Sequence, residues 1–160
     1  MIESRSTNTF RPAVEPGRSL NWRETPGKSP RTYGVLIVED EPLVRRVLDE
    51  GMRQEGFSVW LAASGKEALE LYRRNGQDID VVLLDVRMPG LDGPQTLAAL
   101  KEVSPQIRAC FMSGDLGQYT LGELHTMNAA AFFPKPFRLP DVARALRELA
   151  CNGTLSASSL

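Results

Sequence analysis

The 160-residue sequence predicts an α/β domain in which helices cover both faces of a parallel five-stranded sheet. Three observations favour this class. Short apolar runs such as 35–38 and 81–84 are typical of strands that are buried on both faces. Segments with apolar side chains at helical spacing follow these runs. Glycine and proline punctuate the segments, so strand and helix alternate five times with right-handed crossovers.

The first strand and helix are expected over residues 35–38 and 42–55. Proline at the first position suits a helix start, and Gly56 stands where a helix commonly ends. A second short strand is expected over residues 58–62. The apolar residues of the helix expected over 42–55 recur at a spacing that places them on one side of it. They are Leu43, Val44, Val47, Leu48 and Met52.

The second helix is expected over residues 64–75. Ser64 can cap its first turn, and Glu67 follows three residues later, as in a capping box. The third strand, 81–84, is apolar throughout. Residues 88–93 then combine two glycines with a proline, which predicts a loop at the end of that strand.

The second half of the domain continues the alternation. A helix is expected from residue 93 or 94 to about 103, and a fourth strand over 107–112. A weaker helical pattern covers 117–127 and a fifth strand 130–133. The last helix begins at Pro140, with Val142, Ala145, Leu146 and Leu149 on one face.

The two ends of the chain lack this pattern. Residues 1–32 contain four prolines and no periodicity, with six basic residues against three acidic ones, so we expect a disordered tail. The domain is expected over 33–150 and a loose end over 151–160. No apolar stretch approaches the roughly 20 residues that span a bilayer, and no secretory signal is present. We therefore expect no membrane contact.

Charge and cysteine usage narrow the functional classes. The net charge is −1 and the pI about 5.9, without the basic excess typical of nucleic-acid binding. Cys110 and Cys151 have no metal-ligand spacing, and Cys110 lies in an apolar run where a buried thiol is expected. A reduced, cytoplasmic location follows as an expectation.

Polar side chains follow four of the five predicted strands. Glu39 and Asp40 come after the first, Asp85 after the third, Ser113 after the fourth and Lys135 after the fifth. The carboxyl ends of parallel strands meet at one edge of a sheet, where α/β proteins bind their ligands. We therefore expect these five side chains to share one site.

These residue types point to phosphoryl transfer. Clustered carboxylates repel one another, and a hard cation such as Mg²⁺ relieves that repulsion. Lys135 offers a point charge for a phosphoryl oxygen, and Ser113 offers a hydroxyl donor. Phosphoryl transfer depends mainly on positioning and on charge neutralisation, which is what this set supplies.

Four motifs carry these residues, in order. They are Val-Leu-Ile-Val-Glu-Asp-Glu-Pro at 35–42, Val-Leu-Leu-Asp-Val-Arg-Met-Pro-Gly-Leu-Asp-Gly at 82–93, Met-Ser-Gly at 112–114 and Pro-Lys-Pro-Phe at 134–137. Together they resemble the motifs of response-regulator receiver domains, over about residues 33–150. The resemblance implies a flavodoxin-like doubly wound sheet with strand order 2-1-3-4-5 and five flanking helices.

The resemblance also implies a role for each matching residue. Asp85 matches the phosphorylated aspartate, and Lys135 the lysine that contacts the phosphoryl group. Glu39 and Asp40 match the acidic pair that holds Mg²⁺, or Mn²⁺, together with Asp85 and the backbone carbonyl of Arg87.

Two further residues match the switch positions of the family. Ser113 stands where a Ser or Thr moves toward the phosphoryl oxygens, and Phe132 occupies the aromatic position three residues before the lysine. Their movement is expected to change the face formed by the fourth helix, fifth strand and fifth helix. The Lys135–Pro136 bond matches one that is commonly cis. Arg87 and Asp115 flank the site and are expected to tune hydrolysis.

The implied function is a phosphorylation-activated switch rather than an enzyme, and a stand-alone receiver is expected. The donor is expected to be a sensor histidine kinase or a histidine phosphotransfer protein, because His125 is the only histidine and lies outside the motifs. The downstream protein is unknown, direct nucleic-acid contact is not expected, and the chain is expected to be a monomer or a phosphorylation-dependent dimer.

Three alternatives remain open. The chain could be a phosphorelay intermediate, or an interaction module that works without phosphorylation. It could also be a phosphatase with an aspartate nucleophile. Such enzymes usually carry a second aspartate two residues later, where this sequence has Arg87.

Overall fold

The computed structural model describes residues 31–152. The expected tail over 1–32 and the expected loose end over 151–160 lie outside this range, apart from two residues each. Strands and helices alternate along the described chain. They are β1 Gly34–Val38, α1 Pro42–Gln54, β2 Ser58–Ala62, α2 Gly65–Asn75, β3 Val81–Asp85, α3 Gly93–Val103, β4 Ala109–Ser113, α4 Leu121–Thr126, β5 Ala131–Pro134 and α5 Leu139–Asn152.

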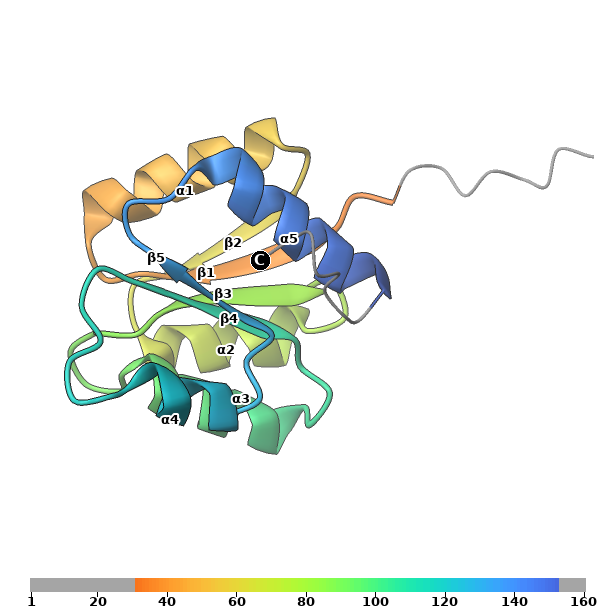
Figure 1. The fold of residues 1–160 in the computed structure, drawn as a ribbon. Helices are drawn as coiled ribbons and strands as arrows, with labels where there is room; N and C mark the ends of the chain where they lie inside the picture. The colour runs from red at the N-terminus through yellow and green to blue at the C-terminus, as the bar shows by residue number, and fades with distance from the viewer. Residues whose placement is uncertain (1–30, 153–160) are drawn as a thin grey trace, which may run out of the picture. The chain divides into compact units, whose positions relative to one another are not determined.

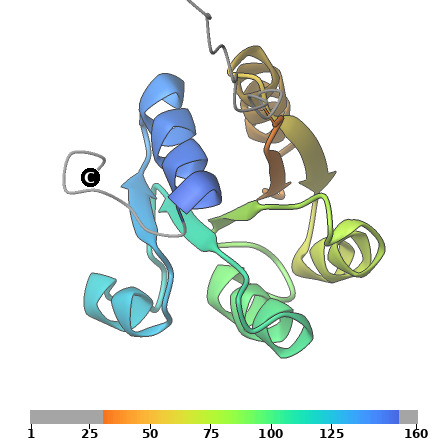
Figure 2. The same ribbon diagram turned by 90° about the vertical axis from the view of Figure 1, so that its right-hand side faces the viewer.

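The five strands form one parallel sheet in the order β2-β1-β3-β4-β5. This confirms the doubly wound, flavodoxin-like class. Helices α1 and α5 cover one face of the sheet, and α2, α3 and α4 cover the other (Figures 1 and 2). β2 lies on one side of β1, and the later strands β3, β4 and β5 are added on its other side. β1 and β3 are therefore neighbours in the sheet, and their carboxyl ends meet.

The core consists of two hydrophobic clusters, one on each face of the sheet. Ile37 packs toward α1 and α5, whereas its neighbour Leu36 packs toward α2 and α3. Alternate strand residues point to opposite faces, and both faces are covered by helices. This explains why the strands are apolar throughout. Cys110 is buried in the first cluster as expected, and burial raises the pKa of its thiol to about 12.

Two predicted boundaries were wrong. The fourth helix covers Leu121–Thr126, not 117–127, because Gly117 has a left-handed φ of 61° and Thr120 caps the helix through a capping box with Glu123. The fourth strand begins at Ala109 rather than at residue 107. The amide of Ile107 donates to the Ser104 carbonyl (3.0 Å) in the turn after α3, and the pairing with β3 starts two residues later.

The other elements agree with the sequence to within a few residues. Ser64 caps α2 through the Glu67 amide, as expected. Asp92 caps α3 with Gln95 in a reciprocal capping box. Among the described residues, none of the helices has the length and apolarity to cross a membrane.

Candidate functional site

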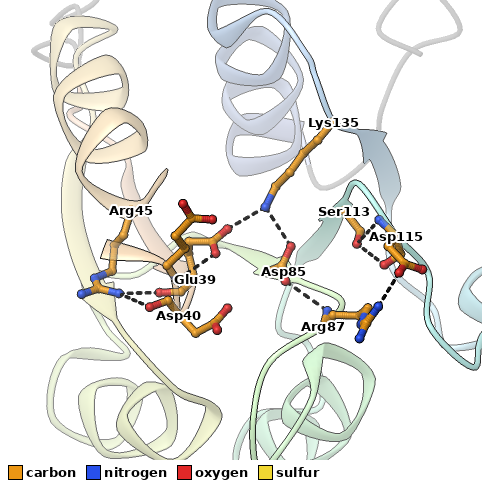
Figure 3. A network of polar contacts seen from close by, with 9 residues as sticks. Glu39, Asp40, Arg45, Asp85, Arg87, Ser113, Asp115 and Lys135 are labelled. Atoms are coloured by element: carbon orange, nitrogen blue, oxygen red, sulfur yellow. Dashed lines mark hydrogen bonds and ion pairs between the residues drawn. The ribbon is translucent and has the colours of Figure 1, made fainter. Parts of the chain in front are cut away.

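The predicted site residues gather at the carboxyl edge of the sheet (Figure 3). Glu39 follows β1 directly, Asp85 ends β3, Ser113 ends β4 and Lys135 follows β5. The parallel pairing sets this edge, since the amide of Lys135, just after β5, donates to the carbonyl of Ser113 at the end of β4 (2.9 Å). The carboxylates of Glu39 and Asp85 are buried, with 2% and 5% of these residues exposed.

Lys135 joins the two buried carboxylates. Its Nζ donates to Glu39 Oε2 (2.7 Å) and to Asp85 Oδ1 (2.9 Å). Burial lowers the pKa of Lys135, but the hydrogen bonds to the two carboxylates outweigh this and raise it above its ordinary value. The lysine is therefore charged at neutral pH and balances part of the negative charge of the site.

Burial has the opposite effect on the acceptor candidate. It raises the pKa of the Asp85 carboxyl, and the hydrogen bond and charge of Lys135 counteract only part of the shift. Nearby Glu39 raises the pKa further, because two negative charges close together disfavour ionisation. An additional cation beside Asp85 would therefore favour the ionised form of its carboxyl group.

Three carboxylates converge as a possible metal site. Glu39, Asp40 and Asp85 each offer one oxygen, and these oxygens lie within 4.8 Å of one another. The amide of Arg87 donates to Asp85 Oδ2 (3.1 Å), which holds the backbone of Arg87 beside them. Hard oxygen ligands from carboxylates and backbone suit Mg²⁺ or Mn²⁺, so the residues present fit the expected ion.

A glycine allows the loop between β3 and α3 to fold back on β3. A Cβ atom at Gly93 would lie 2.3 Å from the Asp85 carbonyl oxygen and 2.9 Å from Val86 Cα. The Gly93 amide also donates to the Val86 carbonyl (3.0 Å). Only glycine permits this approach, and it fixes the start of α3 directly behind Asp85.

Ser113 is engaged with its own loop rather than with Asp85. Its hydroxyl donates to the Asp115 carbonyl and accepts from the Asp115 amide (3.1 Å). The Asp115 carboxylate forms an ion pair with Arg87 across the two loops. The hydrogen bond from the Gly117 amide, and then the Arg87 guanidinium, lower the pKa of Asp115. A cleft of about 750 Å³ between these loops reaches Asp40 at its edge.

The two phenylalanines of β5 lie on opposite faces of the sheet. Phe132 is half-buried and packs beside Phe111 and Leu124, under α4. Phe133 packs on the other cluster, and its ring meets that of Phe137 edge-on at 6.3 Å. Phe132 is therefore the aromatic side chain that contacts the α4 side. The Lys135–Pro136 bond is cis.

Sequence reasoning missed two polar contacts around the site. The Arg45 guanidinium donates to the carbonyls of Glu39 (2.7 Å) and Asp40 (3.1 Å). The Tyr119 hydroxyl donates to Asp92 Oδ2 (2.8 Å), which links the loop before α4 to the start of α3. An arginine one turn into the helix that follows the acidic pair was the available signal for the first contact.

Comparison with known proteins agrees with this geometry. Residues 35–147 match the response regulator receiver domain family. Sporulation initiation phosphotransferase F of Bacillus subtilis is 32% identical over 116 residues, which are 71% of this chain and 90% of that protein. The sensor kinase CckA of Brucella abortus is 38% identical over 115 residues, which are 72% of this chain but 12% of the kinase.

A solved structure shares both fold and sequence. The CheX-CheY-BeF3-Mg²⁺ complex from Borrelia burgdorferi contains a chain 29% identical to this one, with a TM-score of 0.64 over 70% of this chain and 84% of that one. The family match spans β1 to α5 and includes every motif that builds the acidic edge. This chain therefore belongs to the response regulator receiver domain family.

Proposed function

We propose that this chain is a phosphorylation-activated switch whose phosphoacceptor is Asp85. The observation that carries the proposal is the Lys135 ammonium, which contacts both Asp85 and Glu39 at the edge where three carboxylates converge. A cation next to a buried nucleophilic carboxylate, with a metal site beside it, is the arrangement that phosphoryl transfer requires.

The proposed transfer uses the carboxylate as a nucleophile. An Asp85 oxygen attacks the phosphorus of a phosphohistidine on a partner, the P–N bond breaks, and the imidazole keeps the electron pair and takes up a proton. Lys135 Nζ, 2.9 Å from Asp85 Oδ1, then contacts the transferred group. Water later attacks the phosphorus of the acyl phosphate and restores the carboxylate, with release of inorganic phosphate.

The metal role falls to the acidic cluster. Glu39, Asp40, Asp85 and the Arg87 carbonyl would hold Mg²⁺ or Mn²⁺, which supplies positive charge to offset that of the carboxylates and phosphoryl oxygens. Mg²⁺ accompanies the CheY structure from Borrelia burgdorferi, and this likeness supports the assignment.

The switch step starts at Ser113. Its hydroxyl exchanges the Asp115 carbonyl for a phosphoryl oxygen, which draws the loop before α4 toward Asp85. Phe132, beneath α4, turns into the space that this movement opens, and partner binding changes at the face formed by α4, β5 and α5. The short α4 makes few core contacts of its own, since Leu124 is the one residue that it buries, and this favours a movable element.

We assign the docking surface of the phosphohistidine donor to α1. Leu43 and Val47 are 72% and 57% exposed and lie four residues apart on α1, so they form one apolar patch. With Pro136 and Phe137 they line a groove of about 430 Å³ that Lys135 also borders. A donor helix seated there would bring its histidine next to the acceptor edge.

Two measurements test the proposal. Incubation with Mg²⁺ and acetyl phosphate should yield one phosphoryl adduct by intact mass, and the adduct should be absent from Asp85→Asn. An equal adduct on the variant, or none on wild type, would refute the acceptor assignment. Leu43→Glu should keep the adduct from acetyl phosphate but lose transfer from a phosphorylated donor protein. Val103→Glu, a change at another exposed apolar residue (42%), serves as the control and should keep both.

A further inference from the structure

The Arg45 side chain is bound to the backbone of the two acidic residues before α1. Its Nη1 donates to the carbonyl of Glu39 (2.7 Å) and to that of Asp40 (3.1 Å), as Figure 3 shows. The side chain is half-buried, in contrast to its exposed neighbour Arg46. One donor atom therefore fixes the direction of two consecutive peptide groups.

The two acidic side chains depend on this backbone to different degrees. The Glu39 carboxylate has two other partners, since Oε1 accepts from the Glu41 amide (3.1 Å) and Oε2 from Lys135 (2.7 Å). Within residues 31–152, the Asp40 carboxylate has no hydrogen bond or ion pair, although it lies within reach of the other two acids. Its position is set by the backbone alone.

Among the described residues, the peptide group between Asp40 and Glu41 is held, apart from Arg45, by one other contact, the hydrogen bond from the Glu41 amide to Glu39 Oε1 (3.1 Å). The N-cap residue of α1, Glu41, makes no side-chain cap hydrogen bond. The Glu39 amide still donates to the Ala62 carbonyl of β2 (3.1 Å), but the carbonyls of Glu39 and Asp40 turn toward Arg45. Buried or half-buried carbonyls need such partners, so loss of the guanidinium would free the turn to adopt other conformations.

We propose that Arg45 is a positioning residue for the metal site, which holds the turn after β1 so that the Asp40 carboxylate faces Asp85. The inference rests on the proposed function, since it assigns Mg²⁺ to this acidic cluster. Groups that orient metal ligands typically change metal affinity by about 10-fold to 100-fold when they are removed.

Positioning and charge predict opposite effects, which makes the inference testable. Arg45 is a cation close to the metal site, so its removal by charge alone would strengthen Mg²⁺ binding. Removal of a positioning contact would weaken it. The sign of the change in Mg²⁺ affinity therefore separates the two.

The experiment is a calorimetric titration of the full chain with MgCl₂ alone, for wild type, Arg45→Met, Arg45→Lys and Arg46→Met. We expect Arg45→Met to bind Mg²⁺ about tenfold more weakly. Arg45→Lys keeps the charge but replaces the planar guanidinium by a single ammonium, so its affinity should lie between those of wild type and Arg45→Met. Arg46→Met, which loses only a surface pair with Glu50 (2.9 Å), should stay within about twofold of wild type.

A second arm separates positioning from general damage. In the Asp40→Asn background, Arg45→Met should have little further effect on Mg²⁺ affinity, because the ligand that it orients is already lost. Wild-type or tighter binding by Arg45→Met overturns the inference and leaves the proposed function intact. If wild type binds no Mg²⁺, the metal assignment fails, and this inference fails with it. If Arg45→Met does not fold, Arg45→Lys decides, and wild-type affinity in that variant overturns the inference.

Discussion

Replacement of Asp85, the proposed phosphoacceptor, by asparagine should stabilise the metal-free protein. With an effective dielectric constant of about 20, two unit charges 4.8 Å apart repel by about 3.5 kcal/mol. Asp85 has two such neighbours, Glu39 and Asp40, and their oxygens lie within that distance. With the same dielectric constant, the attraction between Asp85 Oδ1 and Lys135 Nζ, 2.9 Å apart, is favourable by about 5.7 kcal/mol. The balance is unfavourable by about 1 kcal/mol before the cost of burial is added.

The pKa of Asp85 gives the same sign and a pH dependence. Burial raises this pKa in the folded state, so the native protein takes up a proton at a higher pH than the unfolded chain does. The ionised carboxylate therefore costs stability at neutral pH, and this cost decreases as pH falls below the raised pKa of the folded state and is gone below the pKa of the unfolded chain. Asp85→Asn should gain about 1–2 kcal/mol at pH 7, or about 4–8 °C in Tm, and the gain should shrink on acidification.

The assay is thermal and urea unfolding of the two proteins at several pH values in the presence of a chelator. Asp49→Asn is the control, since it removes a carboxylate that pairs with Arg53 on the surface of α1, and it should cost a few tenths of a kcal/mol. Equal or lower stability of Asp85→Asn at pH 7 would refute the reasoning, and so would a difference that grows as the pH falls.

Three further outcomes are expected. Mg²⁺ at about 100 times its Kd should raise the unfolding free energy by about 2.7 kcal/mol, which calorimetry would record as a higher Tm, and the Glu39→Gln, Asp40→Asn double variant should lose this gain. Arg87→Ala breaks the ion pair beside the acceptor loop, and we expect the phosphoryl adduct to decay up to about fivefold faster by time-resolved mass spectrometry; an unchanged lifetime would contradict this role. Gly93→Ala places a Cβ against the backbone behind the acceptor, and urea unfolding should reveal a loss of about 1–3 kcal/mol, whereas wild-type stability would mean that the loop moves freely.

The sheet and its acidic edge follow from the sequence for a simple physical reason. Strands buried on both faces must be apolar throughout, so 35–38 and 81–84 are conspicuous, and the first polar residue after each run lies at the edge. Because all strands are parallel, the proximity of Glu39, Asp85 and Lys135 can be predicted without any knowledge of side-chain contacts. Topology alone brings them together.

The contacts that depend on side-chain direction could not be obtained this way. Arg45 binds two carbonyls, and nothing in a pattern of residue types indicates where a flexible guanidinium points. The sequence predicts that Arg87 and Asp115 flank the site, but their ion pair depends on the relative positions of the two loops that carry them. The start of α4 is a different case, because Thr120 and Glu123 form a recognisable capping box that the weak periodicity over 117–127 obscured.

Lys135 has a consequence for how the chain is completed during synthesis. The two buried carboxylates that it joins come earlier in the chain, since the lysine follows Glu39 by 96 residues and Asp85 by 50. A nascent chain that has not yet emerged beyond β5 holds these acids with no lysine between them. The positive charge that balances these acids at the carboxyl edge of the sheet is therefore synthesised with the last strand, and incomplete chains should fold less readily at this edge. The lysine proposed to contact the phosphoryl group is thus also the cation that balances the two buried acids before any phosphoryl group is bound.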